Sequence, residues 1–218
     1  MRVLQLKITL KYSRPPIWRR VLICPDATFW DLHSVIQDLF GWEGYHLHNF
    51  ERAWKRNDDR YFFEVPHEDD FREFMTGMRA PRDYYHDERK EKLANWLTEE
   101  CPIFWYTYDF GDNWEHEIKL EKHLDVPAFK LAKYLGGKRR GLEEDSRFEG
   151  LSDCTTLIKA KDTSSGLWQA IMEDSGKANA DKLIARAQKE STSEAPKRIS
   201  FSDPIQRYKD ALEMGMFD

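Results

Sequence analysis

The chain has 218 residues, of which 40% are hydrophobic, 14% are aromatic and 33% are charged, and its formal net charge at pH 7 is −5. This charge disfavours nucleic acid and anionic lipid as general partners, and no apolar run approaches the roughly 18 residues of a transmembrane helix. Three widely spaced cysteines without a C-x-x-C pair argue against a secreted disulfide framework, and no apolar signal segment opens the sequence, so we expect a cytoplasmic protein.

The first predicted element is a basic β-hairpin. Residues 4–10 alternate apolar and polar side chains, which is the period-2 pattern of a half-buried strand. The segment Arg14-Pro15-Pro16 interrupts this pattern, and residues 17–24 indicate a second strand. Residues 1–24 contain six basic side chains and no acidic one, so the hairpin is positively charged although the whole chain is negative.

The second predicted element is a helix that begins at Thr28. Thr28 and Asp31 have the spacing of a capping box, in which each side chain accepts a hydrogen bond from the backbone N–H of the other residue. Apolar residues recur at helical spacing as far as Phe40, and Gly41 suits the left-handed conformation that commonly ends a helix. We therefore expect an amphipathic helix that covers one face of a sheet.

The next part of the sequence is strongly charged. Residues 45–51 and 61–65 are predicted to form short strands, and residues 87–100 are predicted to form a helix. Because residues 57–100 are otherwise dominated by charged side chains, this segment is interpreted as an insertion on the surface rather than as part of the core.

A second hairpin gives the clearest strand signal. Residues 104–110 and 114–120 alternate apolar and polar side chains, and Gly111-Asp112-Asn113 supplies the turn between them. Together the two hairpins predict one buried sheet face, which the helix covers. The predicted members of this face are Leu4, Leu6, Ile8, Leu10, Phe104, Tyr106 and Tyr108.

This order of elements predicts an α+β fold. Two hairpins and a crossing helix can form one mixed sheet with the helix on one face, an arrangement similar to a β-grasp, although the sequence does not determine the strand order. The core is assigned to residues 1–124, with the charged insertion at about 57–100, and residues 125–218 are interpreted as a helical extension. The helices predicted in this extension span residues 155–174, 180–189 and 204–214.

Three stretches of the sequence resemble the plasmid pRiA4b ORF-3-like family. They are LKITLKYSRPPIWRRV at residues 6–21, DLHSVIQDLFGWEGYHLHNFE at residues 31–51 and YTYDFGDNWEHEIKLEK at residues 106–122. A later family segment, similar to G-x-R-x-x-P-P-E-D-x-G-G, is matched less closely by residues 135–150: the paired prolines and the double glycine are missing, and the corresponding residues are Gly137, Arg139, Glu144 and Asp145. The resemblance implies a domain associated with mobile elements, and it implies no established activity.

Histidines and carboxylates in two of these motifs form a hypothetical metal site. The two imidazoles of residues 46–48 would project from one face of a strand, and two aspartates flank the glycine of the second hairpin turn. Imidazole nitrogens and carboxylates form a ligand set that Zn²⁺, Mn²⁺ or Fe²⁺ accepts. The hypothetical ligands are His46, His48, Asp109, Asp112 and His116.

The competing interpretation of these histidines is structural, and the sequence favours it. His116 alternates with apolar residues such as Trp114, so it belongs on the apolar face of its strand. His46 and His48 share their face with Phe50 in the same way. No cofactor is therefore assigned beyond the hypothetical divalent metal.

The basic hairpin supports a different hypothesis. Its three arginines combine with Trp18 in a composition that binds phosphates and stacks on bases. The alternative is that neighbouring arginines point to opposite faces and pair with acidic groups elsewhere in the protein. Nucleic acid is disfavoured as a partner because the chain carries a net charge of −5. The arginines are Arg14, Arg19 and Arg20.

The function that the sequence favours is a non-catalytic binding or interaction domain with an unknown protein partner. Polar and aromatic side chains on the loops of a rigid scaffold are typical of this role. Two alternatives stay open: a mobile-element accessory protein that contacts DNA through the basic hairpin, and a metal-dependent hydrolase that uses the histidine and aspartate set. No residue is assigned a catalytic role. The hypothetical contact surface consists of Arg14, Trp18, Arg19, Arg20, His46, His48, Asp109, Asp112 and Trp114.

Overall fold

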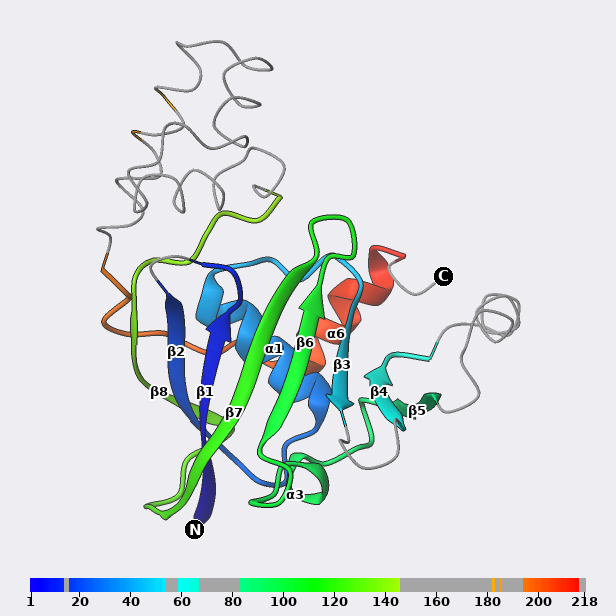
Figure 1. Ribbon diagram of the computed structural model, residues 1–218, viewed down its shortest axis with the longest axis vertical. Helices are drawn as coiled ribbons and strands as arrows, with labels where there is room; N and C mark the ends of the chain where they lie inside the picture. The colour runs from blue at the N-terminus through cyan, green and yellow to red at the C-terminus, as the bar shows by residue number, and fades with distance from the viewer. Residues whose placement is uncertain are drawn as a thin grey trace.

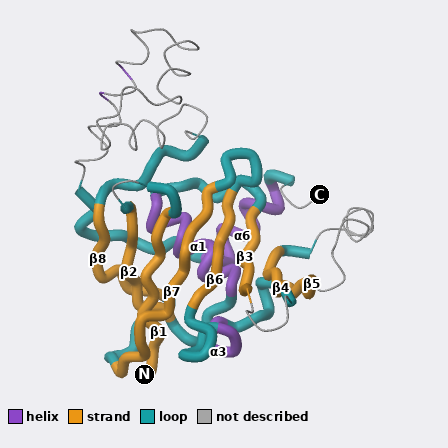
Figure 2. The backbone as a smooth tube through the Cα atoms, in the orientation of Figure 1, coloured by secondary structure: helices purple, strands orange, loops and turns teal. Residues whose placement is uncertain are grey.

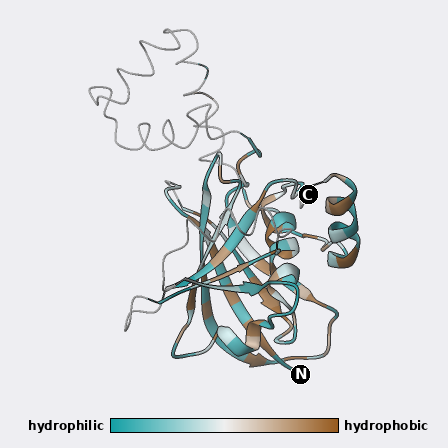
Figure 3. Cartoon of the chain, turned by 90° about the vertical axis from the view of Figure 1, so that its right-hand side faces the viewer, coloured by the Kyte–Doolittle hydropathy of each residue, from teal (hydrophilic) through white to brown (hydrophobic). Residues whose placement is uncertain are grey.

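The computed structural model describes residues 1–13, 16–53, 59–66, 83–145, 182, 185 and 194–215. The strands are β1 (Arg2–Leu10), β2 (Ile17–Ile23), β3 (His48–Ala53), β4 (Arg60–Glu64), β5 (Asp83–Asp87), β6 (Ile103–Tyr108), β7 (Trp114–Asp125) and β8 (Ala132–Lys138). The helices are α1 (Phe29–Phe40), α3 (Leu93–Trp96) and α6 (Pro204–Glu213). Helix α1 crosses one face of the sheet and α6 lies on the same side (Figure 1, Figure 3). The predicted α+β class is confirmed.

The strands form one eight-stranded sheet in the order β5-β4-β3-β6-β7-β1-β2-β8. Neighbouring strands are antiparallel except β4 and β5, which run parallel. The two predicted hairpins lie side by side because β1 pairs with β7, from Arg2 opposite Asp125 to Leu10 opposite His116. The mixed sheet is therefore present, whereas the finer likeness to a β-grasp stays a prediction.

The core lies between the sheet and α1, on the face that the alternation predicted. Phe29 is at its centre: its ring centroid lies 4.2 Å from that of Phe63 and 5.2 Å from those of Phe50 and Phe104. Truncating such a ring to alanine typically costs about 3–5 kcal/mol. The predicted face is buried throughout, at Leu4, Leu6, Ile8, Leu10, Phe104, Tyr106 and Tyr108.

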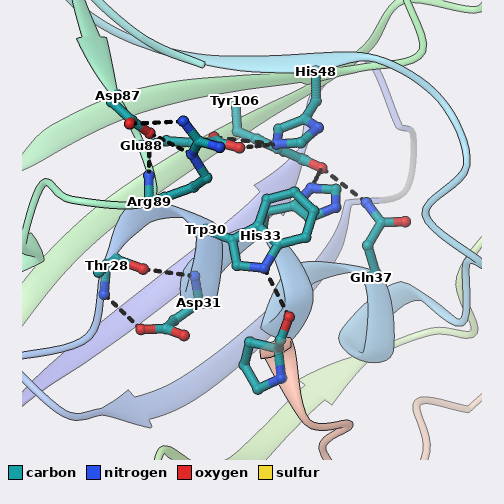
Figure 4. Close-up of polar contacts among 11 residues, drawn as sticks. Thr28, Trp30, Asp31, His33, Gln37, His48, Asp87, Glu88, Arg89 and Tyr106 are labelled. Carbon is teal, nitrogen blue, oxygen red and sulfur yellow. Dashed lines mark hydrogen bonds and ion pairs between the residues drawn. The ribbon is translucent and has the colours of Figure 1, made fainter. Parts of the chain in front are cut away.

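Helix α1 begins and ends as its sequence predicts. The Thr28 hydroxyl accepts a hydrogen bond from the Asp31 N–H (3.1 Å), and the Asp31 carboxylate accepts one from the Thr28 N–H (2.8 Å), as Figure 4 shows. Gly41 ends the helix in the left-handed conformation, with φ of 79°. These local signals fix the start and end of α1, and so they determine which side chains it directs at the sheet.

The segment interpreted as a surface insertion contributes to the core, which corrects that expectation. Strands β4 and β5 extend the sheet, and Leu93 and Leu97 are buried. The helix predicted over residues 87–100 is reduced to the four residues of α3. The backbone N–H of Leu93 donates to the carbonyl oxygen of Ala27 (2.8 Å), outside its own segment. The chain at Leu93 therefore packs beside the start of α1 and does not form the longer helix.

The predicted boundary at residue 124 is also corrected. Strand β8 pairs with β2, so the sheet continues into the part that was interpreted as a helical extension. Helix α6 confirms the helix predicted over residues 204–214, and the helices predicted over 155–174 and 180–189 fall almost wholly outside the described residues. None of the helices in the described part of the chain is long and apolar enough to cross a membrane.

Candidate functional site

Three loops meet at the end of the sheet where the chain enters β3 and where β6 turns into β7 (Figure 2). We call residues 42–47, 109–113 and 142–145 the loop end. The Asp109 N–H donates to the Leu47 carbonyl oxygen (2.9 Å), and the Trp42 indole N–H donates to the Leu142 carbonyl oxygen (2.9 Å). The loops are far apart in the sequence, and these hydrogen bonds hold them together.

The turn between β6 and β7 has the geometry that its sequence suggests. Asp109 and Asn113 both adopt the left-handed conformation with φ of 54°, which aspartate and asparagine tolerate better than most residues. The Gly111 N–H donates to Asp109 Oδ1 (2.9 Å). The Asp109 side chain is therefore fixed by its own turn, with its second oxygen directed away from that hydrogen bond.

A cluster of polar side chains lies at the centre of the loop end. His46 Nε2 lies 2.9 Å from Asp145 Oδ1 and 3.8 Å from Asp109 Oδ2. The Tyr45 hydroxyl donates to Asp145 Oδ2 (3.0 Å), and burial, followed by this hydrogen bond, raises the pKa of Tyr45 to about 12. One ligand atom from each of His46, Asp109 and Asp145 lies within 4.8 Å of the others, which makes them the candidate metal-binding set within the described residues.

Hydrogen bonds and ring stacking by Tyr108 form the floor of this cluster. The buried Tyr108 hydroxyl donates to Glu144 and accepts the N–H of His46 (3.3 Å). Its ring stacks on the Trp42 indole at 5.4 Å. Burial, together with the Glu144 hydrogen bond, raises the pKa of Tyr108 well above its usual value. Tyr108 therefore stays protonated and holds the loop of His46 against the loop of Glu144.

Only part of the hypothetical metal set comes together here. His46 and Asp109 meet, and Asp145 joins them from a segment that the sequence interpretation had placed in a helical extension. The signal that could have identified Asp145 is its place in the acidic pair of the weaker family motif. His48 does not join, because β3 begins at His48 and the strand alternation does not extend back to His46.

His48 belongs to a second, buried cluster (Figure 4). Its Nε2 lies 2.9 Å from a carboxylate oxygen of Glu88, and its ring stacks on that of His33 with centroids 3.6 Å apart. Gln37 donates its amide N–H to the Tyr106 hydroxyl (2.8 Å), and that hydroxyl lies 2.8 Å from His33 Nδ1. We call His33, Gln37, His48, Glu88 and Tyr106 the buried network.

Burial controls the ionisation of the buried network. It raises the pKa of the Glu88 carboxyl. Burial also lowers the pKa of His33 well below 6.5, and the charges of His48 and Arg207 lower it further. The sequence interpretation missed Glu88 because it follows β5, in the segment that was interpreted as a surface insertion. The parallel pairing of β4 and β5 brings it beneath α1, where its carbonyl oxygen accepts the Trp30 N–H (3.1 Å).

The remaining residues of the hypothetical metal set are buried separately. His116 is fully buried, as its alternation predicted; its Nδ1 lies 3.2 Å from the Trp114 carbonyl oxygen, and its ring packs on those of Phe40 and Trp42. Burial lowers the pKa of His116 to about 3. Asp112 and Trp114 are also buried, with 4% and 2% of their surface exposed, so neither offers much surface to a ligand.

Arg19 and Arg20 of the basic hairpin both bind other groups of the protein. Arg19 is fully buried and donates to the carbonyl oxygens of Leu39 (2.8 Å) and Lys138 (3.1 Å), which joins the end of α1 to β8. Arg20 makes two hydrogen bonds to the Glu121 carboxylate, at 2.6 and 2.7 Å, and its guanidinium lies over the Trp18 ring. The expectation that Arg19 lies on a contact surface is therefore corrected. Arg14 lies outside the described residues.

Similarity to known proteins establishes the family of the chain. The model of the family described as "Plasmid pRiA4b ORF-3-like protein" matches residues 2–178. The chain belongs to this family. The match includes the loop end and the buried network, and it continues beyond the three motifs from which the resemblance was first inferred.

Two relatives of this family member carry no functional assignment. The uncharacterized protein y4hQ of Sinorhizobium fredii (strain NBRC 101917 / NGR234) is 33% identical over 121 residues, which cover 55% of this chain and 54% of y4hQ. The match therefore spans about half the length of that relative. The crystal structure of MM3350, a protein of unknown function from Methanosarcina mazei Go1, is similar with a TM-score of 0.61 and 26% identity, covering 94% of this chain and 95% of that one.

Proposed function

We propose that this pRiA4b ORF-3-like protein is a non-catalytic binding domain whose loop end contacts a protein partner. The observation that carries the proposal is the pair of exposed aromatic residues beside the polar cluster: Tyr45 is 39% exposed and Phe110 is 52% exposed. Large aromatic side chains are enriched in protein interfaces, where they bury much surface with little loss of side-chain freedom. A cytoplasmic location and an association with mobile elements are part of the proposal.

The scaffold beneath these aromatics supports the same proposal. Phe110 follows Asp109 in a turn whose backbone is fixed by the Gly111 hydrogen bond, and Tyr45 is tied to Asp145 through its hydroxyl. A surface that is ordered before binding loses little conformational freedom on association, which favours affinity. We do not propose DNA contact through the basic hairpin, because Arg19 and Arg20 bind other groups of the protein.

The proposal is tested by site-specific photo-cross-linking in cells of the native host. A photoreactive phenylalanine analogue replaces Phe110, and the matched control carries it at Tyr84, which is 47% exposed on β5 and outside the loop end. We expect one discrete protein adduct from position 110 and none from position 84.

The adduct is identified by mass spectrometry, and its protein is then purified. The purified partner should bind the wild-type chain and lose about tenfold or more in affinity with Phe110→Ala, which is the effect of a residue that dominates an interface. Equal adducts from both positions, or unchanged affinity with Phe110→Ala, would contradict the proposed surface.

A further inference from the structure

We propose that the loop end also binds a divalent transition-metal cation, held by His46 Nε2, Asp109 Oδ2 and Asp145 Oδ1. The inference rests on the proposed function in one respect, because the ion would lie within the same contact surface and would help to form it.

The distances fit a shared ion. Zinc-ligand bonds to nitrogen and oxygen are about 2.0–2.2 Å long, so two atoms bound to the same ion lie roughly 3–4 Å apart. His46 Nε2 lies 2.9 Å from Asp145 Oδ1 and 3.8 Å from Asp109 Oδ2. The third distance, between the ligand atoms of Asp109 and Asp145, is within 4.8 Å, and movement of the exposed Asp145 side chain would bring the three atoms around one ion.

Asp109 presents an oxygen that its surroundings do not satisfy. The residue is 8% exposed. Its Oδ1 accepts the Gly111 N–H, but its Oδ2 lies 3.8 Å from His46, which is too far for a hydrogen bond. Within the described part of the chain this oxygen has no closer partner. A bound cation would give this oxygen the partner that it lacks among the described residues.

Both carboxylates are oriented in the way that metal ligands usually are. In each one, a neighbour binds one oxygen and leaves the other facing His46: the Gly111 N–H holds Asp109, and the Tyr45 hydroxyl holds Asp145. Hydrogen bonds of this kind fix the direction of metal-binding side chains and strengthen metal binding. The arrangement therefore directs one oxygen of each carboxylate towards the His46 imidazole, and a bound ion would replace the present contact of 2.9 Å between His46 Nε2 and Asp145 Oδ1.

The ligand set indicates which ions the site would take. One imidazole with two carboxylates suits Zn²⁺, Mn²⁺ or Fe²⁺ better than Ca²⁺, which prefers six to eight oxygen ligands. Two carboxylates and a neutral imidazole carry two negative charges, which a divalent cation neutralises. Three protein ligands leave at least one coordination position for water or for a donor group of the partner.

The test measures metal binding by the full-length chain without a histidine tag. Isothermal titration calorimetry with Zn²⁺ and with Mn²⁺, and elemental analysis of the purified protein, report stoichiometry and affinity. We expect one equivalent of one of these ions, and we expect Asp145→Asn to lower the affinity by about tenfold or more, since hydrogen-bonded neighbours of ligands alone change it by 10–100-fold. Tyr45→Phe, which removes only the hydroxyl that orients Asp145, should lower it by a smaller factor.

Asp26→Asn is the matched control, because the Asp26 side chain is 76% exposed and pairs with Lys92, away from the loop end. The control should bind the ion as the wild type does, and circular dichroism checks that each variant is folded. The inference is overturned if the folded wild type shows no saturable binding of either ion at millimolar concentration, or if Asp145→Asn binds as tightly as Asp26→Asn.

The metal inference and the proposed function fail in distinguishable ways. If photo-cross-linking from position 110 succeeds while no ion binds, the partner surface stands and the metal inference falls. If one equivalent of ion binds through Asp145 while position 110 gives no adduct, the metal inference stands and the partner surface falls. Repeating the cross-linking with a chelator then shows whether the ion takes part in partner binding.

Discussion

His46 and His48 are separated by one residue in the sequence, and they lie in opposite environments. The His46 side chain is 29% exposed, and its Nε2 lies 2.9 Å from the exposed carboxylate of Asp145 and 3.8 Å from that of Asp109. The His48 side chain is 2% exposed and forms a close pair with a fully buried carboxylate. The histidine–carboxylate pair of the loop end is thus open to solvent and to added ligands, whereas the pair of the buried network is enclosed by the fold.

This difference teaches how a motif rich in histidine and aspartate should be interpreted. A polar group that is buried and paired mainly affects stability, because breaking the pair leaves an uncompensated group in a medium of low polarity. A polar group that is accessible and incompletely bonded can be removed at little cost in stability, so its contribution appears in binding. Stability and binding measurements on matched variants therefore separate the two regions.

The largest expected effect is in the buried network. Glu88→Ala removes the partner of His48 and leaves a cavity beneath α1, so we expect a loss of about 3–5 kcal/mol in the free energy of unfolding, as is typical when one member of a buried pair is removed. Urea unfolding followed by circular dichroism measures it. A loss below about 1 kcal/mol would show that the pair of His48 and Glu88 contributes little to stability, and the contrast with the loop end would then fail.

The second effect concerns pH and His116. Burial lowers the pKa of this histidine from 6.5 to about 3, so the unfolded chain binds a proton in this interval and the folded chain does not. The stability that His116 contributes is complete above pH 6.5 and is lost as the pH falls towards 3, by at most about 1.4 kcal/mol per pH unit.

The free energy of unfolding, measured by urea unfolding between pH 6.5 and 4, should therefore change less with pH for the folded His116→Gln variant than for the wild type. If the free energy of unfolding changed equally with pH in the His116→Gln variant and the wild type, burial would not keep His116 neutral.

The smallest effect is expected at Asp145. Because its side chain is 54% exposed, Asp145→Ala should change the free energy of unfolding by no more than about 0.5 kcal/mol, as surface substitutions usually do. The same urea experiment checks it. A loss comparable to that of Glu88→Ala would show that the loop end is a structural element, and the proposed division between the two regions would have to be abandoned.

Local patterns in the sequence were sufficient for the elements of the fold that depend on neighbouring residues. The alternation of the hairpins and the capping box of α1 specify which side chains face the core. Arg19 shows two conflicting signals. Its alternation with Ile17 and Val21 indicated the buried face of the strand, whereas its charge suggested the surface. A buried arginine becomes predictable only when its carbonyl partners are known.

The candidate site was only half predictable for a related reason. His46 and Asp109 lie in recognisable motifs, but Asp145 reaches His46 across 99 residues, and Glu88 reaches His48 across 40. Such pairs depend on strand order, which periodicity does not reveal. The weaker acidic motif around Asp145 and the parallel pairing of β5 were the features that the sequence interpretation could not place in space.

The pairing of β1 with β7 also has a consequence for synthesis of the protein. The hairpin of β1 and β2 is complete at residue 23, but β7, the partner of its β1 edge, ends at Asp125. At about 5–20 residues per second, translation would leave this edge unpaired for roughly 5–20 s. An unpaired edge can associate with other chains, so the nascent hairpin should depend on the ribosome, on chaperones or on its own basic charge to stay separate until β7 emerges.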